Sequence, residues 1–405
     1  MDRIEIKRLK NYKIFIERNL IIYKKSKYKS LIKNILVRLS GLIGTALRLH
    51  RQARKIDILF ILNCNKTNER IRPIIEYINE ALDIEVEIRR NILKNIISLK
   101  LGIIPLNIPV LLTDEYSEAR YYSEIYDPKV IVLLENESIL SSFLKHFTHA
   151  KIVNIAHGVR TNLVEHSNIN YDYYLIYGKS SLVHMKNNPY LFGNTVPVIT
   201  GSPFIKNVTK KCNENYKIQS VIYFSQYQNK RVKDYLSFSN NIFIKFAIKN
   251  PYVKCIVKPH PLENTDYWLN LVKGIHNIQI VDSKVDIFDI LKPGVVSVVA
   301  WSNAALESAL VNCPIISIDG SGFADNNLDI SKYFPVVTSV SEFECALDAI
   351  QKNYLEYQEV CKKFVNYHLG YTNDSYIKVA ETIINILKGE YLSHYSLTEN
   401  INWNQ

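Results

Sequence analysis

From residue 56 onward, short apolar runs alternate with longer segments whose apolar residues recur at helical spacing. Continuous apolar runs are typical of strands buried on both faces of a parallel sheet, and the alternation is typical of βαβ units. Helical patterns such as Arg70–Leu82 and Ser138–His149 separate several of the runs. The first half is therefore predicted to be a doubly wound α/β domain. Its predicted strands are Ile56–Asn63, Val110–Thr113, Val130–Leu134, Lys151–Ala156, Tyr173–Tyr177 and Val196–Thr200.

The alternation stops at Gly201-Ser202-Pro203 and resumes after a polar segment, residues 206–217, which we interpret as a linker. A chain of 405 residues is too long for one ordinary core. We predict two doubly wound domains facing a cleft, with one such domain plus an unrelated one as the alternative. The predicted strands of the second half are Ser220–Phe224, Tyr252–Val257, Ile278–Val281, Val295–Val299 and Pro314–Ile318. Its predicted helices are Val232–Lys249, Ala304–Val311, Glu342–Asn366 and Tyr376–Lys388. The predicted boundaries are an arm at 1–55, domains at 56–203 and 204–390, and a loose tail at 391–405.

The net charge of +11 is concentrated in the arm. Residues 1–55 contain 16 Lys or Arg and three acidic residues, a balance of +13. The total of 50 basic and 39 acidic residues leaves 34 basic and 36 acidic side chains for the other 350 residues, a balance of −2. A nearly neutral body argues against nucleic acid as a partner, and the arm is expected to touch an anionic surface.

The second part of the arm has the pattern of a basic amphipathic helix. Lys33, Arg38, Arg48 and Arg51 fall largely between apolar residues, namely Leu31, Ile32, Ile35, Leu36, Leu39, Leu42, Ile43, Ala46 and Leu47. Such a helix lies readily in the interface of an anionic membrane. The alternative is a helix that packs on the first domain with a solvated basic face.

Nothing in the sequence predicts secretion or a membrane span. The first 30 residues are too densely charged for a signal peptide, and no apolar stretch approaches about 20 residues. The six cysteines form no CxxC pair, which favours reduced thiols. We therefore expect a cytoplasmic protein, peripheral on the inner face of the cell membrane.

Lys258 and His260 flank Pro259 directly after an apolar run of the second half. Open α/β sheets bind ligands at the carboxyl ends of their strands. The two prolines, Pro259 and Pro261, stiffen the loop and keep it out of a helix. Both side chains are therefore candidates to bind a diphosphate, and the alternative is a surface turn with incidental charges.

A second candidate segment follows the predicted strand Val295–Val299. Ser302 and Asn303 are candidate N-caps of the next helix, whose first amides are suited to phosphate. Glu307, about one turn inside, is either an acceptor for ribose hydroxyls or a capping-box partner. Lys230 and Arg231, after the first strand of this half, either reach the same phosphate or are solvated.

His157 is the candidate general base of the first half. It follows an apolar run, its ordinary pKa near 6.5 suits deprotonation of a hydroxyl, and Gly158 lets a substrate approach the backbone. The alternative is a structural histidine. Asp114 and Glu135, each after a predicted strand, are alternative bases. Gly201 either brings backbone amides to a ligand or serves as the hinge.

Several common motifs are absent from the sequence. There is no GxGxxG, GxxxxGK[ST], HExxH or GxSxG. There is also no Asp-x-Asp pair, so we expect no metal that clamps a diphosphate through that motif, and no cofactor. Charge neutralisation must then come from Lys, Arg, His and helix amides.

Four motifs occur in a familiar order: His157-Gly158, Thr200-Gly-Ser-Pro203, Lys258-Pro-His-Pro261 and a Ser302 segment entering a helix with Glu307. In this order they resemble bacterial GT-B glycosyltransferases of surface polysaccharide synthesis. The nearest group contains CDP-glycerol glycerophosphotransferases, capsule polymerases and sialyl- and Kdo-transferases. The resemblance covers about residues 56–390. Glycerophosphotransferases usually show an acidic-aromatic-Ser-Ser run where this chain has Ala300-Trp-Ser-Asn303, which favours a sugar donor.

The resemblance implies a metal-independent, inverting glycosyltransferase of capsule or lipopolysaccharide O-antigen synthesis. It implies that residues 204–390 bind the nucleotide-sugar donor and residues 56–203 a glycan or lipid-linked acceptor. His157 would be the base, Lys258 and His260 would bind the donor phosphates, and the residues completing the nucleotide site would be Ser302, Asn303 and Glu307. The alternatives are a polyol-phosphate transferase, a nucleotide-sugar 2-epimerase and a non-catalytic membrane subunit of an assembly complex.

Overall fold

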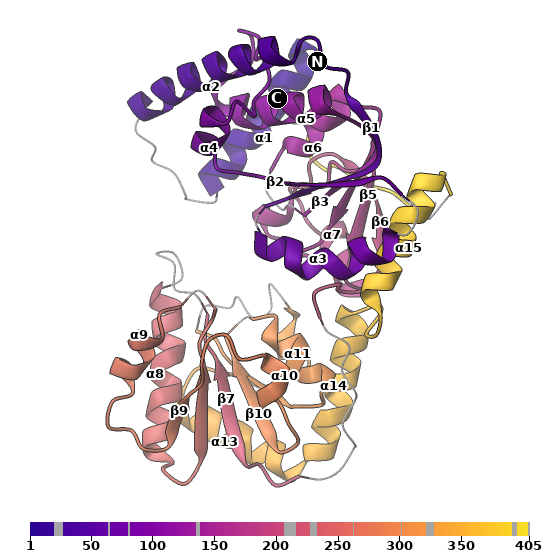
Figure 1. The fold of residues 1–405 in the computed structure, drawn as a ribbon. Helices are drawn as coiled ribbons and strands as arrows, with labels where there is room; N and C mark the ends of the chain where they lie inside the picture. Colours follow the sequence, from indigo (N-terminus) through magenta and orange to yellow (C-terminus); the bar gives the residue numbers. More distant parts are fainter. Residues whose placement is uncertain are drawn as a thin grey trace. The chain divides into compact units, whose positions relative to one another are not determined.

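The chain forms two compact units, each built around a parallel sheet (Figure 1). Unit 1 comprises Met1–Phe204 and Asp374–Gln405, and unit 2 comprises Ile205–Asn373. This computed structural model describes residues 1–19, 27–63, 65–79, 82–134, 138–205, 216–226, 233–261, 263–300, 302–320, 328–390 and 395–403.

The sheet of unit 1 has the strand order β13-β6-β5-β4-β3-β1-β2. Its strands are β1 (Arg54–Leu62), β2 (Ile84–Ile88), β3 (Tyr126–Leu133), β4 (Lys151–Ile155), β5 (Tyr173–Ile176), β6 (Asn194–Ile199) and β13 (Leu397–Thr398). All neighbouring pairs are parallel except β13 with β6. The chain fills the sheet in one direction from β1 to β2 and in the other from β3 to β6. The strand order therefore reverses between β1 and β3.

Helices surround this sheet, and two of them cover one face although they lie far apart in the sequence. The helices of unit 1 are α1 (Arg3–Asn19), α2 (Lys27–Arg48), α3 (Asn65–Ile78), α4 (Ile92–Ile97), α5 (Thr113–Ile125), α6 (Leu140–Phe147), α7 (Lys179–Lys186) and α15 (Ser375–Lys388). Short 3-10 turns occur at η1 (Val110–Leu112) and η2 (Val164–His166). Ile74 of α3 and Ile383 of α15 share a buried cluster with Val130 of β3 and Val153 of β4. This cluster fixes the C-terminal helix to the N-terminal sheet.

Unit 2 repeats the architecture with the strand order β12-β11-β10-β7-β8-β9, all parallel. Its strands are β7 (Ser220–Phe224), β8 (Lys254–Lys258), β9 (Ile278–Ile280), β10 (Val295–Val299), β11 (Ile315–Ile318) and β12 (Val336–Val337). Its helices are α8 (Lys233–Lys249), α9 (Thr265–Leu271), α10 (Ile287–Ile290), α11 (Ala304–Leu310), α13 (Val340–Lys352) and α14 (Tyr354–His368), with a 3-10 turn η3 (Ile330–Lys332). The order reverses between β7 and β10.

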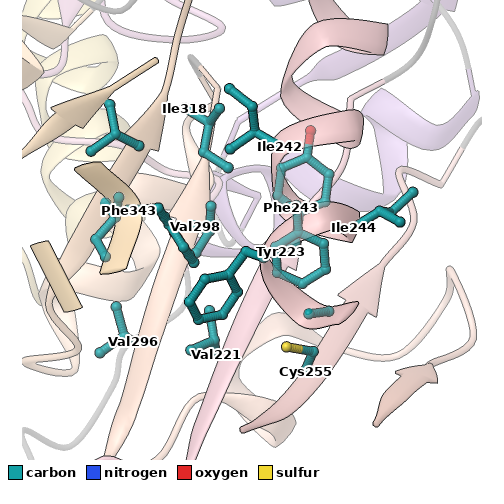
Figure 2. Close-up of a cluster of buried hydrophobic side chains, with 14 of the residues drawn as sticks. Val221, Tyr223, Ile242, Phe243, Ile244, Cys255, Val296, Val298, Ile318 and Phe343 are labelled. Atoms are coloured by element: carbon teal, nitrogen blue, oxygen red, sulfur yellow. The ribbon is translucent and has the colours of Figure 1, made fainter. Parts of the chain in front are cut away.

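Aliphatic and aromatic side chains together fill the core of unit 2 between its sheet and helices (Figure 2). Tyr223 of β7 stacks on Phe243 of α8 with ring centroids 4.9 Å apart. Phe246, one turn further along α8, meets Phe343 of α13 edge-on at 4.1 Å. Offset and edge-on pairs of this kind add about 0.5–1.5 kcal/mol beyond burial. They hold α8 and α13 over the same face of the sheet.

The doubly wound α/β class predicted for both halves is confirmed, with local corrections. The predicted strand Val110–Thr113 is wrong: these residues form η1 and begin α5. Asp114 and Glu115 follow directly, and carboxylates are favoured in the first turn of a helix. Strand β2 was missed, and the single helix predicted over Glu342–Asn366 is divided at Asn353, whose φ of −123° and ψ of 36° are not helical.

The C-terminal boundary also differs from the prediction. Residues 374–390 pack in unit 1, because α15 contributes Val379 and Ile383 to its core. Residues 395–403 are not a loose tail. Leu397 pairs with Thr195 of β6, and Trp403, 6% exposed, meets Tyr12 of α1 edge-on at 5.1 Å. The chain therefore leaves unit 1 after Phe204 and returns to it for its last helix and strand.

The predicted arm is two helices of unit 1, and α2 packs with the opposite face from the one expected for a helix packed on the first domain. Its buried residues are polar or small: Asn34, Val37, Ser40, Gly41 and Gly44. Its large apolar residues, from Ile32 to Leu47, are exposed. No helix among the described residues is long and apolar enough to cross a bilayer.

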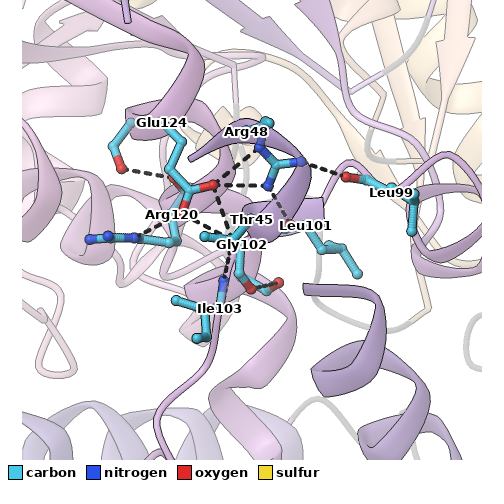
Figure 3. A network of polar contacts seen from close by, with 10 residues as sticks. Thr45, Arg48, Leu99, Leu101, Gly102, Ile103, Arg120 and Glu124 are labelled. Atoms are coloured by element: carbon cyan, nitrogen blue, oxygen red, sulfur yellow. Dashed lines mark hydrogen bonds and ion pairs between the residues drawn. The ribbon is translucent and has the colours of Figure 1, made fainter. Parts of the chain in front are cut away.

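Three basic residues that were expected to face lipid or solvent instead anchor α2 to the rest of unit 1. Figure 3 shows the contacts of one of them, Arg48. Arg48 donates hydrogen bonds to the carbonyls of Leu99 (2.8 Å) and Leu101 (2.7 Å), and pairs with Glu124 at 2.9 Å. Arg38 likewise donates to the carbonyls of residues 104, 105 and 108. Lys33 pairs with Asp114. Neither predicted orientation of the basic face is therefore correct for these three residues.

We predict that Gly41→Ala destabilises the protein. A methyl group there would clash with the Gly102 carbonyl oxygen, which is backbone and cannot rotate away. Overpacking costs about 1–3 kcal/mol, and it must first offset the gain of about 1 kcal/mol in helix propensity. Urea denaturation should show a net loss in the free energy of unfolding.

Leu42→Ala is the matched control, because Leu42 lies on the opposite face of α2 and is 53% exposed. It should change the free energy of unfolding by less than about 0.5 kcal/mol. Equal effects of the two substitutions would contradict the observed orientation of α2.

Candidate functional site

In unit 2, three neighbouring strands bring candidate residues to the carboxyl edge of the sheet. Ser225 follows β7, Lys258 ends β8 with His260 two residues on, and Ser302 follows β10. The register is parallel throughout, so these strand ends lie side by side. The reversal of strand order between β7 and β10 is also the place where open α/β sheets bind their ligands.

The loop after β8 is organised by Glu263. One oxygen of its carboxylate accepts the His260 backbone N–H at 3.0 Å and the Ser225 hydroxyl. The Glu263 N–H in turn donates to the His260 carbonyl at 2.8 Å. The partly exposed His260 is thus held by hydrogen bonds as well as by its flanking prolines. We did not predict Glu263 from the sequence; its place three residues after His260, the spacing of a capping carboxylate, was the available signal.

Lys258 lies behind this loop and is only 7% exposed. Its ammonium donates to the carbonyls of Ser283 (2.6 Å) and Pro259 (3.3 Å). Burial lowers the pKa of Lys258, while the charges of Asp282, Glu307 and Asp286 act in the opposite direction. The lysine therefore places a positive charge beneath the edge, surrounded by carbonyls and carboxylates.

The segment after β10 brings the remaining candidates beside Lys258. The Ser302 hydroxyl accepts the Ala304 N–H at 3.2 Å, whereas the Asn303 side chain makes no cap hydrogen bond. Of the two candidate caps, Ser302 is the one that bonds. Glu307 is close enough to act on the pKa of Lys258, although the two residues belong to different strand exits. Lys230 and Arg231 lie outside the described residues.

In unit 1, His157 follows β4 and is exposed at the carboxyl edge. The Tyr177 hydroxyl, after β5, donates to the His157 carbonyl at 3.0 Å, and the Phe204 ring lies 5.6 Å from the imidazole. Desolvation, with smaller contributions from Arg70 and Arg160, lowers the pKa of His157. The imidazole is therefore neutral at neutral pH and can accept a proton.

The other candidates of unit 1 are distributed differently. Gly158 is adjacent to His157, and Gly201 follows β6 at the same edge with φ of +78°, a conformation that favours glycine. Asp114 does not follow a strand as predicted: it lies in the first turn of α5 and is paired with Lys33. Glu135 lies outside the described residues.

The comparisons with known proteins identify the fold. No protein-family model and no curated protein matches this sequence. Among solved structures, the chain is similar to the S. aureus protein MnaA, in a co-structure with UDP, at 13% identity and a TM-score of 0.56, covering 85% of this chain and 99% of that one. It is also similar to the wall teichoic acid polymerase TagF, in a structure with CDPG, at 12% identity and a TM-score of 0.50, covering 90% of this chain and 99% of that one. These likenesses show that the chain has the GT-B fold, as the sequence predicted.

We predict that Arg70→Gln raises the pKa of His157. The Arg70 charge disfavours the imidazolium, so removing it should shift the midpoint upward toward the ordinary value. NMR titration of the His157 ring proton measures this directly. Arg72→Gln, two residues further along α3, is the control and should leave the midpoint unchanged. A His157 midpoint that responds equally to both substitutions would exclude a specific effect of Arg70.

Proposed function

We propose that this protein is a glycosyltransferase that moves a sugar from a nucleotide-activated donor to a glycan or lipid-linked acceptor at the inner face of the cell membrane. One observation carries the proposal. In a GT-B fold, a histidine with a lowered pKa lies at the carboxyl edge of one sheet, and a buried lysine, a histidine and serine hydroxyls lie at the carboxyl edge of the other. Capsule and O-antigen synthesis are the pathways that the sequence resemblance favours.

Unit 2 is proposed to bind the donor. His260, held by Glu263 and the prolines, is placed to donate a hydrogen bond to a donor phosphate, and the Ser302 and Asn303 segment lies at a neighbouring strand exit. The buried Lys258 adds positive potential from beneath the loop. A preorganised charge in a desolvated place stabilises a developing phosphate anion more than the same charge in water. This set needs no metal.

Unit 1 is proposed to activate the acceptor. His157 takes the proton of an acceptor hydroxyl while that oxygen attacks the anomeric carbon of the sugar. The bond between the anomeric carbon and the donor phosphate breaks, its electron pair leaves with the nucleotide, and the configuration inverts. Because the pKa of His157 is lowered, the base form persists below the ordinary histidine range. The acidic limb of kcat/KM should therefore fall below pH 6.5.

Three alternatives predict different products from one substrate panel. A nucleotide-sugar 2-epimerase would convert a UDP-sugar without an acceptor, and a polyol-phosphate transferase would consume CDP-glycerol. A non-catalytic subunit would give no turnover with any donor. Calorimetry with UDP, CDP and other nucleotides separates a competent donor site from a degenerate one, since a degenerate site gives no heat at millimolar nucleotide.

We predict that His157→Ala and His260→Ala each lower transfer by about 10²–10⁴-fold, the usual contribution of a positioned acid or base. His157→Ala should lower kcat and leave nucleotide affinity unchanged, because His157 belongs to unit 1. His260→Ala should weaken nucleotide binding in calorimetry. Steady-state transfer with a nucleotide sugar measures the first effect.

His149 and His276 supply the controls, since both are exposed histidines, one in each unit. His149→Ala and His276→Ala should retain full activity and the melting temperature of the parent. Full activity of His157→Ala would remove this histidine from the mechanism, and unchanged nucleotide binding by His260→Ala would remove that one from the donor site.

A further inference from the structure

Helix α2 exposes an apolar stripe from Ile32 to Leu47. Seven large apolar residues recur at helical spacing, and each is between 43% and 67% exposed: Ile32, Ile35, Leu36, Leu39, Leu42, Ile43 and Leu47. Single exposed apolar residues are ordinary on a soluble protein, but a contiguous row marks an interaction surface. Burying one leucine-sized side chain is worth about 1.5–3 kcal/mol, so leaving seven exposed forgoes a large stabilisation.

The elements that pack against α2 add further exposed apolar residues. Helix α4 contacts α2 and exposes Leu93 (62%) and Ile97 (83%). The segment 103–110, whose carbonyls bind Arg38, exposes Ile103, Leu106 (92%) and Val110. We call these twelve residues of α2, α4 and segment 103–110 the apolar face. All of it belongs to unit 1, where α2 lies outside α4 and α5 (Figure 1).

The packing of α2 explains why this stripe points outward. Gly41 and Gly44 let the helix approach the backbone of residues 99–102 so closely that an added Cβ at Gly44 would lie 2.7 Å from the Leu99 carbonyl oxygen. Arg38 and Arg48 then bind carbonyls of the same region. Small residues and guanidinium anchors fix the inner side, so the apolar side cannot turn inward without breaking them.

The charges around the apolar face favour an anionic lipid surface as its partner. In the segments that contain the face, Lys33, Arg48, Arg54, Arg89 and Lys100 pair with carboxylates of neighbouring elements. Arg51, Lys55, Arg90 and Lys94 of the same segments are exposed. A second copy of the chain would juxtapose these like charges, which costs affinity at a protein interface. Anionic headgroups complement them instead, and apolar side chains enter the region just below the headgroups.

We infer that the apolar face inserts into one leaflet of an anionic bilayer, with α2 lying in the membrane plane. This inference deepens the membrane partner of the proposed function and rests on it for its biological setting. It differs from the arm predicted by sequence in two respects. The contact extends beyond residue 55 to α4 and segment 103–110, and Lys33, Arg38 and Arg48 bind the rest of unit 1 instead of facing lipid.

Flotation of the full chain with vesicles of phosphatidylcholine and phosphatidylglycerol tests the inference. Leu39→Glu with Ile43→Glu should lower the partition coefficient at least tenfold, because two carboxylates would enter the inserted face. Leu106→Glu, in a segment outside α2, should weaken binding as well. Ile248→Glu is the control, since Ile248 is 59% exposed on α8 of unit 2, and it should bind as the parent does. Unchanged melting temperatures show that the variants fold.

Salt separates insertion from attraction by charge. At about 0.5 M NaCl the screening length is only about 4 Å, so binding that depends on charge alone is lost, whereas inserted side chains retain part of it. Complete loss of binding in salt, or parent-like binding by the Leu39 and Ile43 double variant, would overturn the inference. A parent chain that is dimeric by mass photometry and ignores vesicles, with a monomeric double variant, would assign the face to a second copy instead.

Measuring nucleotide binding in solution tests the proposed function independently of vesicle binding. The double variant should bind nucleotide as the parent does, because donor binding is assigned to unit 2. Vesicle binding by a chain that binds no nucleotide would retain the membrane face and reject the transferase. A chain that binds nucleotide and transfers sugar to a soluble acceptor but does not bind vesicles would retain the transferase and reject the membrane face.

Discussion

Parallel pairing in a fixed register is the constraint on which both candidate sites depend. Val130 of β3 lies opposite Lys151 of β4, and Tyr223 of β7 opposite Val257 of β8, so each sheet collects its carboxyl ends along one edge. A slip of one residue would turn every side chain of the strand to the other face. The apolar residues buried on both faces of the strands oppose such a slip, because it would disrupt their packing on both sides of the sheet. Residues as distant in sequence as Ser225, Lys258 and Ser302 thereby reach neighbouring positions.

Sequence periodicity was sufficient to predict the strands that are buried on both faces, but it was insufficient to predict the other elements discussed below. Strands β7 and β10 are mainly apolar runs with one serine each, Ser220 and Ser297, and the structure buries every residue of both. Strand β2 alternates Ile and Val with Glu at the sheet edge and is only partly buried, so its apolar content was too low to predict it. The run Val110–Thr113 was long enough to suggest a strand, but its length also suits a 3-10 turn entering a helix. The assignment of α15 to unit 1 depends on long-range packing, which no local pattern contains.

Helix α2 shows a different limit of sequence reasoning. The helical periodicity predicted for α2 was correct. A helical periodicity defines two faces, however, and does not determine which of them packs against the rest of the domain. The usual assumption buries the apolar face, and here the glycines and arginines reverse it. Gly41, Gly44 and Ser40 were the available signal, because small residues at spacings of three and four permit a close backbone approach. Arg38 and Arg48, which were expected to meet lipid through their charge, instead donate hydrogen bonds to the carbonyls of residues 99, 101, 104, 105 and 108.

Three carboxylates of unit 2 act on the buried Lys258 before any ligand arrives. Lys258 is buried, its pKa is lowered by desolvation, and Asp282, Glu307 and Asp286 oppose that shift. An anionic ligand at this edge would add to the effect of the carboxylates and raise the pKa of Lys258, so binding would stabilise the ammonium that burial disfavours. Before a ligand binds, the carbonyls of Pro259 and Ser283 accept hydrogen bonds from the Lys258 ammonium. Glu263 accepts the His260 backbone N–H and so fixes the loop after β8. The proposed donor site would therefore be preorganised, because the loop and the buried cation are held in place before a phosphate binds.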